Sequence, residues 1–310
     1  MNKASCRKAF TDTLLKVGRE NPKIFAVTTD ASGSVTLGEF AHTLPQQFVE
    51  MGIAEQDAVS VGAGLSLNGR NVFVCGPACF LSARSFEQIK VDVAYNHTNV
   101  KLVGVSGGLS YGPLGATHIT LHDIAQMRTL PGLTTLLPSD AVQTAFLTEQ
   151  LASWEGPVYM RMGRGDVCDV YQPGDTFEIG KAKEIFYGTD FTIIACGEMV
   201  FHAKKAAERL KEEGCSVRLL DMFTLKPLDK DAILAAARET GKILTVEEHS
   251  INGGLGSAVA QITGQEYPVP LKILGLPDEE IVAGTSEELF VYYHIDADGI
   301  YQAAKELLEK

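Results

Sequence analysis

Short apolar runs of strand length alternate with helical patterns along nearly the whole chain, and this alternation most restricts the possible folds. In the first half, strands are expected at 23–29, 71–76, 99–106, 133–138 and 157–162. Helical patterns lie between them, at 53–68, 84–97, 118–129 and 139–152. Apolar strands joined by helices indicate a parallel sheet with helices on both faces.

The alternation breaks between residues 163 and 190, where Gly, Asp and turn residues accumulate without a long helical pattern. It resumes with strands expected at 191–197, 216–222, 242–248 and 269–275. The helices expected beside these strands lie at 199–213, 229–240, 254–264 and 297–309. Because 310 residues suffice for two cores, we predict two parallel-sheet α/β domains, at 1–165 and 191–310, joined by a linker at 166–190.

Composition and charge exclude several classes of partner. The net charge is −12 and no Lys/Arg-rich run occurs, so nucleic acid and anionic membranes are not expected partners. The first 20 residues have the pattern of an amphipathic helix, not of a signal peptide, and no run of about 18 apolar residues is present. The cysteines lie mostly in or beside apolar runs, which favours a reduced, cytoplasmic protein without a zinc site.

The stretch EMGIAEQDAVSVGAG places the carboxylate of Glu55 among small and apolar residues. On a helix, the residues three and four positions away are Gly52, Ala58, Val59 and Gly62. None of them is basic, so we expect an unpaired carboxylate whose pKa is raised by burial. Glu55 is therefore a candidate acid/base residue or the partner of a ligand nitrogen. The alternative is a residue at a helix start that complements the helix dipole.

Two glycine-rich segments follow expected strands. The segment GGLGSA at 253–258 lacks the GxGxxG spacing of a dinucleotide loop, and no GxxxxGK[ST] is present. We interpret these glycines as sites of close helix–sheet packing. The segment GGLSYGPLGATHITLHD at 107–123 runs from a strand end into a helix expected near Thr117. Loops at this end of parallel strands commonly bind ligands.

Three histidines lie in these regions. His118 is expected in the first helical turn, as a substrate-contacting residue or a structural cap. His118 and His122 could share a helix face as metal ligands, but no third ligand is indicated, so no metal site is expected on this chain. His249 follows another strand and could also face a cleft.

Taken together, GIAEQ, CFLSARSFEQI, GATH, LPSD and EEHSINGGLGSAV, in this order, resemble the transketolase superfamily of thiamine-diphosphate enzymes. The resemblance covers nearly the whole chain. It is closest to the C-terminal subunit of split transketolases, which carries the pyrimidine-binding and C-terminal domains. This resemblance implies a transferase that moves a two-carbon ketol unit from a ketose, phosphorylated or otherwise anionic, to an aldose.

The resemblance implies roles toward the cofactor, thiamine diphosphate. Glu55 matches the glutamate that hydrogen-bonds N1′ of the aminopyrimidine and favours the tautomer that takes the proton from thiazolium C2. Phe80 matches the aromatic residue that stacks on the pyrimidine ring, and Phe86 is a second candidate for that role. The alternative for both phenylalanines is core packing, more strongly for Phe86.

The resemblance also implies substrate contacts. His118 matches the histidine near the reacting carbonyl, and Arg164 matches an arginine that holds the anionic end of the sugar. Arg7 and Thr28 lie in regions that assist, although a surface salt bridge is the alternative for Arg7. At two further positions the chain departs from the family pattern. Leu114 replaces an aspartate that reads a sugar hydroxyl, and Ser106 replaces a phosphate-binding histidine, so the substrate sugar stays open.

A second polypeptide is implied as well. Family members bind the diphosphate through Mg²⁺ with a GDG motif followed by Asn, and this sequence contains no GDG. We therefore expect an N-terminal transketolase subunit to hold Mg²⁺ and the diphosphate in a heterotetramer. The alternatives are an enzyme like 1-deoxyxylulose-5-phosphate synthase, the beta subunit of a 2-oxoacid dehydrogenase, and a regulatory partner without catalysis.

Overall fold

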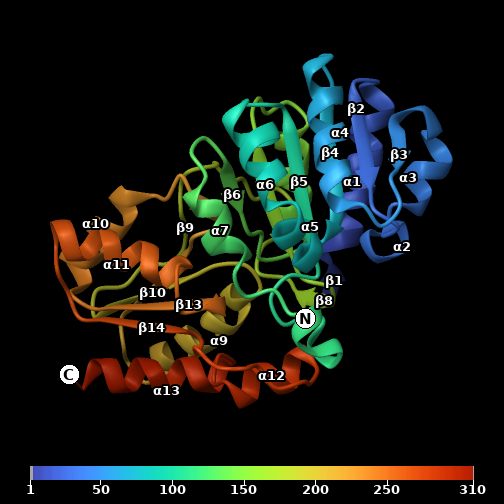
Figure 1. Ribbon diagram of the computed structural model, residues 1–310. Coiled ribbons are helices and arrows are strands. Elements are labelled where there is room, and N and C mark those ends of the chain that lie inside the picture. Colours follow the sequence, from blue (N-terminus) through green and yellow to red (C-terminus); the bar gives the residue numbers. More distant parts are fainter. Residues whose placement is uncertain (1–2, 310) are drawn as a thin grey trace.

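The computed structural model describes residues 3–309 and has two mainly parallel sheets (Figure 1). The first sheet has the strand order β12-β6-β7-β5-β4-β2-β3. Its strands are β2 (Ile24–Thr28), β3 (Phe48–Glu50), β4 (Asn71–Pro77), β5 (Val100–Val105), β6 (Thr134–Leu136), β7 (Val158–Met162) and β12 (Thr224–Lys226). Neighbouring strands are parallel except β12, which runs antiparallel to β6.

The second sheet has the order β14-β13-β10-β11-β9. Its strands are β9 (Lys183–Phe186), β10 (Phe191–Ala195), β11 (Val217–Asp221), β13 (Ile243–Ser250) and β14 (Leu271–Leu276). Only the pairing of β9 with β11 is antiparallel among the described strands of this sheet. The predicted fold class, two parallel-sheet α/β units, is confirmed, whereas the domain limits at 165 and 191 stay a prediction.

Helices cover both faces of the first sheet because its strands are apolar on both sides. Along β4, Phe73 and Cys75 belong to the core that contains α1 (Cys6–Glu20) and α8 (Ala141–Leu151). The alternate residues Val72 and Val74 belong to a second core with α4 (Glu55–Leu67) and the π-helix at Ile89–Tyr95. The period of two along the strand therefore assigns the helices to opposite faces.

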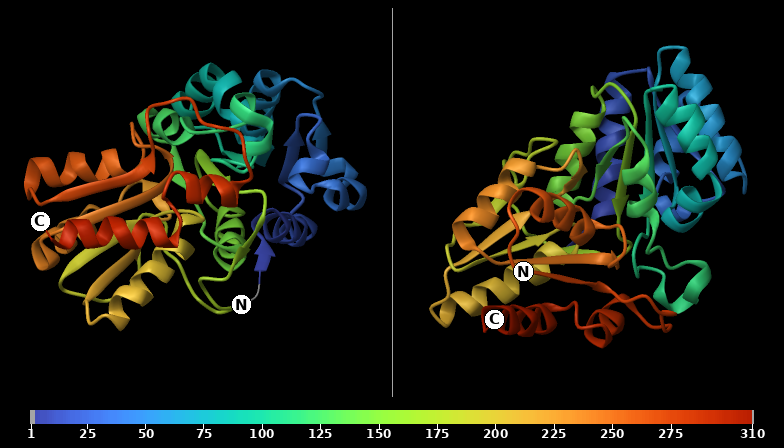
Figure 2. Two further views of the ribbon diagram at one scale, coloured as in Figure 1. Left: turned by 90° about the horizontal axis from the view of Figure 1, so that it is seen from below. Right: turned by 60° about the vertical axis from the view of Figure 1, so that its left-hand side comes forward.

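The second sheet repeats this arrangement, as the two views of Figure 2 show. On one face, α9 (Met199–Glu212) packs with α13 (Ala297–Leu308). The other face is covered by α10 (Lys230–Thr240) and α11 (Leu255–Glu266). The remaining elements are β1 (Lys3–Ser5), α2 (Ser32–Val35), α3 (Gly38–Thr43), α5 (Ala78–Arg84), α6 (Phe86–Gln88), α7 (Asp123–Thr129), β8 (Asp166–Cys168), α12 (Ser286–Tyr292) and two 3₁₀ turns at Pro45–Gln47 and Gly112–Thr117.

Two predicted helices are wrong at their boundaries. The helix expected at 84–97 instead begins directly after Pro77, so that α5 occupies 78–84 and the π-helix follows at 89–95. The helix expected at 118–129 begins only at Asp123. Residues 118–122 before it are not helical, because the amide of Thr120 donates to the carbonyl of Gly108 (2.9 Å) and the two residues form an isolated β-bridge.

The segment at 163–190 connects the two lobes and packs against both. Its first part, β8, pairs antiparallel with β1 near the N-terminus, and its last part, β9, joins the second sheet. Between them, Tyr171 and Phe177 are buried in the core that includes residues of both sheets. No helix within 3–309 is both long enough and apolar enough to cross a membrane.

Candidate active site at the carboxyl ends of the first sheet

Glu55 begins α4 and is only 4% exposed. Its carboxylate is not unpaired: Nη1 of Arg84 donates to both carboxylate oxygens, at 3.3 and 3.2 Å. The expectation of an unpaired carboxylate is therefore wrong. Helix periodicity considers only neighbours along α4, whereas Arg84 comes from α5, 29 residues further along the chain.

Phe80 lies beside this ion pair on α5. Phe80 and Arg84 are four residues apart on the helix, and Cζ of Arg84 lies 4.1 Å from the centre of the Phe80 ring. Glu55 and Arg84 line a surface pocket of about 340 Å³ together with residues 53–57. Ile53 at its edge is 75% exposed. The arrangement presents a buried carboxylate at an open hollow, and Arg84 links this carboxylate to the Phe80 ring.

His118 joins this group from the loop that follows β5. Its ring lies 5.1 Å from that of Phe80 and 5.4 Å from that of Tyr111, between centroids, and both contacts are edge-to-face. Oγ1 of Thr117 lies 2.8 Å from Nδ1 of His118. His118 follows a 3₁₀ turn at Gly112–Thr117 and lies before α7. The prediction that it sits in a first helical turn is wrong, and so is the shared helix face with His122.

Two arginines form the other end of the cluster. Nη1 of Arg164 donates to the hydroxyl of Tyr111 at 2.8 Å. Arg7 donates to the backbone carbonyl of Arg164 through Nε (3.0 Å) and Nη2 (2.7 Å), and to that of Ser34 through Nη1 (2.6 Å). Burial, and after it the nearby charge of Arg164, lowers the pKa of Arg7. Within 3–309, neither arginine has a carboxylate at ion-pair distance, which favours an anionic ligand here.

The structure thus brings Glu55, Phe80, His118, Arg164 and Arg7 into one continuous series of contacts. The other candidates lie outside this series. Thr28 is fully buried and its hydroxyl donates to the carbonyl of Cys75 at 2.9 Å. Ser106 is fully buried, whereas Leu114 is 55% exposed. Phe86 packs against the core on the α4 face of the sheet.

The second lobe holds the loop that carries His118. Oε1 of Glu248 accepts from the amide of Leu109 at 2.6 Å, and the hydroxyl of Ser286 donates to the carbonyl of Leu109 at 3.2 Å. Glu248 is itself paired with the buried Arg161, whose Nη2 lies 3.2 Å from its Oε2. The position of the loop therefore depends on contacts between the lobes.

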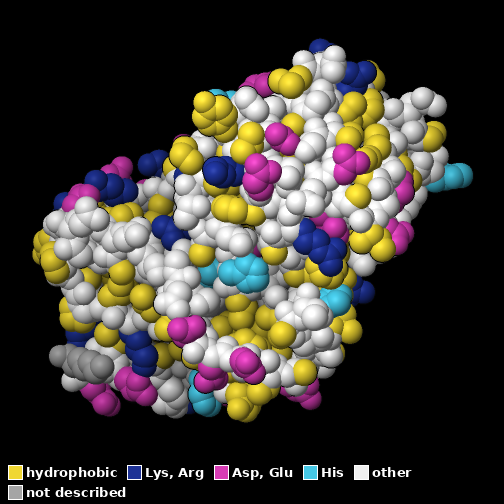
Figure 3. Space-filling view, viewed as in Figure 1, with side chains coloured by type: hydrophobic (Ala, Val, Ile, Leu, Met, Phe, Trp, Pro, Cys, Tyr) yellow, Lys and Arg dark blue, Asp and Glu magenta, His cyan; other side chains and the backbone are white. Residues whose placement is uncertain are grey.

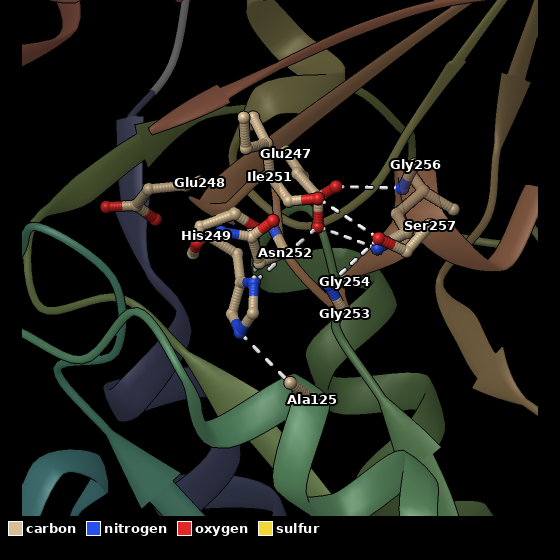
Figure 4. A network of polar contacts seen from close by, with 12 residues as sticks. Ala125, Glu247, Glu248, His249, Ile251, Asn252, Gly253, Gly254, Gly256 and Ser257 are labelled. Atoms are coloured by element: carbon tan, nitrogen blue, oxygen red, sulfur yellow. Dashed lines mark hydrogen bonds and ion pairs between the residues drawn. The ribbon is translucent and has the colours of Figure 1, made fainter. Parts of the chain in front are cut away.

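The GGLGSA segment opens α11, and its helix start is occupied by a side chain of the same lobe (Figure 4). Glu247 accepts from the amides of Leu255 (2.7 Å) and Gly256 (2.8 Å), and burial raises the pKa of its carboxyl to about 7. A Cβ on Gly256 would lie 2.4 Å from Cγ2 of Ile273. Close helix–sheet packing is therefore confirmed, and the amides at this helix end already donate to Glu247.

His249 does not face a cleft, contrary to expectation. It is fully buried, its Nε2 lies 3.5 Å from the amide of Ala125, and its Nδ1 lies 2.7 Å from the carbonyl of Ser250 (Figure 4). Burial lowers its pKa to about 4. It connects the lobes as a neutral side chain. Among the described residues, no group of three or more His, Cys, Asp or Glu could hold a metal ion.

Three contributors to the cluster were not predicted: Tyr111, Arg84 and Ser34. Arg84 was missed because the helix was predicted to begin at residue 84, whereas α5 begins at Ala78. Phe80 and Arg84 were therefore not recognised as residues four apart on one helix. Tyr111 is an aromatic residue in a glycine-rich loop after a strand, and that signal was available. Ser34 contributes a backbone carbonyl, which no sequence pattern marks.

The face seen in Figure 3 shows how charges are distributed around the boundary between the lobes. Histidine side chains lie along this boundary, and basic side chains are interspersed with acidic ones without a continuous basic patch. This distribution agrees with the net charge of −12. A polyanion such as nucleic acid would find no extended positive surface on this face.

Comparisons with known proteins identify the family of both parts of the chain. Family models match at residues 2–169, as the transketolase pyrimidine-binding domain, and at 180–300, as the transketolase C-terminal domain. The chain is 56% identical over 310 residues to a subunit of the apulose-4-phosphate transketolase of Phocaeicola vulgatus, over 100% of this chain and 99% of that protein. It is 34% identical to a 6-deoxy-6-sulfo-D-fructose transketolase subunit of Clostridium sp., over 98% and 94% of the two chains. A solved split-gene transketolase, described as an inactive beta4 tetramer, matches with a TM-score of 0.89 and 38% identity, over 99% of both chains.

Proposed function

Since the chain belongs to the transketolase family, we propose that it is the C-terminal subunit of a two-chain transketolase that depends on thiamine diphosphate. In this proposal the complex moves a two-carbon ketol unit from an anionic ketose to an aldose. The observation that carries it is the series of contacts that joins Glu55, Phe80, His118 and Arg164 along one edge of the first sheet.

Glu55 and Phe80 fit the aminopyrimidine end of the cofactor. A carboxylate that is 4% exposed and lines an open pocket can form a hydrogen bond with a ring nitrogen, and the Phe80 ring offers a stacking surface. The guanidinium of Arg84 contacts both the Glu55 carboxylate and the Phe80 ring. Its side chain is 48% exposed and can rotate away when the cofactor binds. When bound, thiamine diphosphate supplies the electron sink for the transferred unit.

His118 and the two arginines fit the substrate. The imidazole is held at its edges by Phe80 and Tyr111, so it can present a nitrogen to a carbonyl oxygen or hydroxyl. Arg164 and Arg7 offer guanidinium groups to a phosphate. His118 thus lies between the cofactor end and the anion end, as a two-carbon transfer from a sugar phosphate requires.

We propose apulose 4-phosphate as the donor. The support is the 56% identity to a subunit named for that substrate, together with the two arginines that lack a carboxylate partner within 3–309. Leu114 supports a donor whose hydroxyl pattern differs from that of ordinary transketolase substrates, because its apolar side chain is 55% exposed and cannot accept a hydrogen bond.

A partner subunit would complete the site. Ile53 exposes 75% of its surface at the edge of the Glu55 pocket. A second hollow, of about 440 Å³ and mainly apolar, opens where the π-helix at Ile89–Tyr95 meets Leu130. Exposed apolar surface of this kind is typical of interfaces. We propose that the N-terminal transketolase subunit covers both surfaces and binds Mg²⁺, and that the two kinds of subunit form a heterotetramer. The partner, the metal, the heterotetramer and a cytoplasmic location stay predictions.

The test combines this chain with a GDG-carrying transketolase subunit, thiamine diphosphate and Mg²⁺, and offers apulose 4-phosphate with an aldose phosphate acceptor. We expect ketol transfer, and a kcat for Glu55→Gln that is about 10²–10⁴-fold lower. Glu39→Gln is the matched control, because Glu39 is an exposed glutamate in the first turn of α3.

Other outcomes would contradict the proposal. Unchanged turnover of Glu55→Gln would support a regulatory subunit instead. Release of CO₂ from a 2-oxoacid would indicate a dehydrogenase subunit or a deoxyxylulose-phosphate synthase. The chain alone serves as a further control: tight binding of thiamine diphosphate and Mg²⁺ to it in calorimetry would contradict the two-chain model.

A further inference from the structure

We infer that Tyr111 is a positioning residue that sets the direction of Arg164 and the ring plane of His118, and that it thereby selects substrates with an anionic group. The inference rests on the proposed function and deepens it. It concerns a residue outside the motifs that carry the family resemblance. Tyr111 lies in the loop between β5 and the 3₁₀ turn at Gly112–Thr117.

The hydroxyl of Tyr111 has a defined partner on each side. It accepts from Nη1 of Arg164 at 2.8 Å and donates to Oγ of Ser34 at 3.3 Å. A phenol has one proton to donate, and the contact with Ser34 uses it, which leaves the oxygen lone pairs directed at the guanidinium. Because one partner is charged, the bond to Arg164 is the stronger of the two.

The ring of Tyr111 contacts Arg164 a second time and also contacts His118. Cζ of Arg164 lies 4.8 Å from the ring centre. The ring of His118 lies 5.4 Å away at an interplanar angle of 78°. One side chain therefore contacts His118 and Arg164, two of the three groups that the proposed function assigns to the substrate, and it fixes their separation.

The backbone of Tyr111 is held in place by the second lobe. The next residue, Gly112, has no room for a side chain, because a Cβ would lie 2.2 Å from the carbonyl oxygen of Gly284 and 2.6 Å from Cδ1 of Leu289. Two residues earlier, Leu109 is held by Glu248 and Ser286. A loop that is fixed on both sides makes Tyr111 a rigid platform for mobile, long side chains.

This geometry has a consequence for specificity. An arginine with no described carboxylate partner would sample many rotamers, and ordering it on binding would reduce affinity. Tyr111 orders Arg164 before the substrate arrives, without neutralising its charge. The advantage applies only to a substrate that carries an anionic group at the distance that Tyr111 sets. A ketose without such a group gains nothing from it.

The experiment uses the reconstituted complex and the variant Tyr111→Phe, which keeps the ring and removes the hydroxyl. We expect the KM for apulose 4-phosphate to rise about tenfold, with kcat within about twofold. The KM for L-erythrulose, a ketose without a charged group, should not change. Binding of inorganic phosphate, followed by line broadening in phosphorus NMR, should weaken by a similar factor.

Two further variants make the result decisive. Tyr187→Phe is the matched control, because Tyr187 is 66% exposed, lies outside the contact series and the apolar hollow, and should leave both KM values unchanged. Arg164→Met should raise the KM for the phosphorylated donor more than Tyr111→Phe does. Two results would overturn the role of Tyr111 but not the proposed anion end. One is a KM increase in Tyr111→Phe that is equal for both donors. The other is an unchanged KM in Tyr111→Phe together with a large KM increase in Arg164→Met. An unchanged KM in Arg164→Met would overturn the proposed anion end and this inference with it.

Discussion

At the scale of single residues, the pair of Glu55 and Arg84 shows how a buried carboxylate is accommodated in this chain. Glu55 is 4% exposed, whereas the Arg84 side chain is 48% exposed. The guanidinium therefore lies toward solvent and neutralises the carboxylate from the side of the open pocket. A carboxylate left in this place without a cation would be costly because few water molecules can reach it.

Arg84→Met tests this compensation in the chain by itself. The methionine keeps an unbranched stem against Phe80 but removes the cation, so we expect the free energy of unfolding to fall by about 1 kcal/mol, a value reduced for the exposure of the arginine. Urea denaturation at pH 7 measures it. Arg70→Met is the control, because Arg70 stacks on Phe25 with its Cζ 5.0 Å from the ring centre and forms no described ion pair. Equal effects of both variants would contradict the role of the carboxylate.

At the scale of secondary-structure elements, α11 shows how a helix can lie very close to a sheet. Its second residue, Gly256, faces Ile273 on β14 and the hydroxyl of Thr245 on β13, and a Cβ would lie 2.4 and 2.8 Å from them. Glu247 binds the first amides of the same helix from β13. The start of α11 is thus fixed by a glycine and a carboxylate that act together.

Gly256→Ala and Gly264→Ala should have opposite effects on stability although both lie on α11. In the first, the methyl group overpacks the helix–sheet contact, and we expect the free energy of unfolding to fall by about 1–3 kcal/mol. In the second, a Cβ meets nothing within 4 Å, so removing a helical glycine should raise it by about 0.5–1 kcal/mol. Chemical denaturation of the two variants decides, and a stabilising Gly256→Ala would contradict the packing described for α11.

At the scale of the whole molecule, buried polar side chains join the two lobes. Asp221 on β11 is fully buried, and its Oδ2 accepts from Tyr171 at 2.8 Å and from Nε2 of Gln143, on α8 of the first lobe, at 2.9 Å. Burial raises the pKa of this carboxyl to about 7. Ionisation of Asp221 therefore places an uncompensated charge between the lobes.

The sign of the resulting pH dependence follows from proton binding. Between about pH 4 and pH 7 the folded chain keeps the Asp221 proton while the unfolded chain has lost it, so the contribution of Asp221 to stability decreases as the pH rises through this window. Asp221→Asn imitates the protonated form. We expect the stability of the wild type relative to this variant to decrease between pH 5 and pH 7, by at most about 1.4 kcal/mol per pH unit, and to level off above.

Denaturation curves of both proteins at several pH values measure this difference. Other buried groups, such as Glu198 and His249, contribute to both curves, so the comparison isolates Asp221. Parallel stability profiles of the two proteins would show that Asp221 does not titrate between the lobes.

Local patterns in the sequence were sufficient for the architecture. Strands such as β4 and β10 and helices such as α9 and α13 lie within a few residues of their expected positions, because alternation and helical periods reflect burial of neighbouring residues. The motif order was sufficient for the family. The predicted helix boundary at His118 failed, because the bridge between Gly108 and Thr120 is a contact across a loop that periodicity does not detect.

What the tertiary structure alone decided is which side chains meet. Arg84 reaches Glu55 across 29 residues, Arg164 reaches Tyr111 across 53, and Arg7 reaches the carbonyl of Arg164 across 157. These partners come from different helices and loops, and their meeting depends on strand order and on loops that the second lobe holds in place. Burial of apolar surface follows local composition, whereas a directional polar contact needs both partners at one point in space.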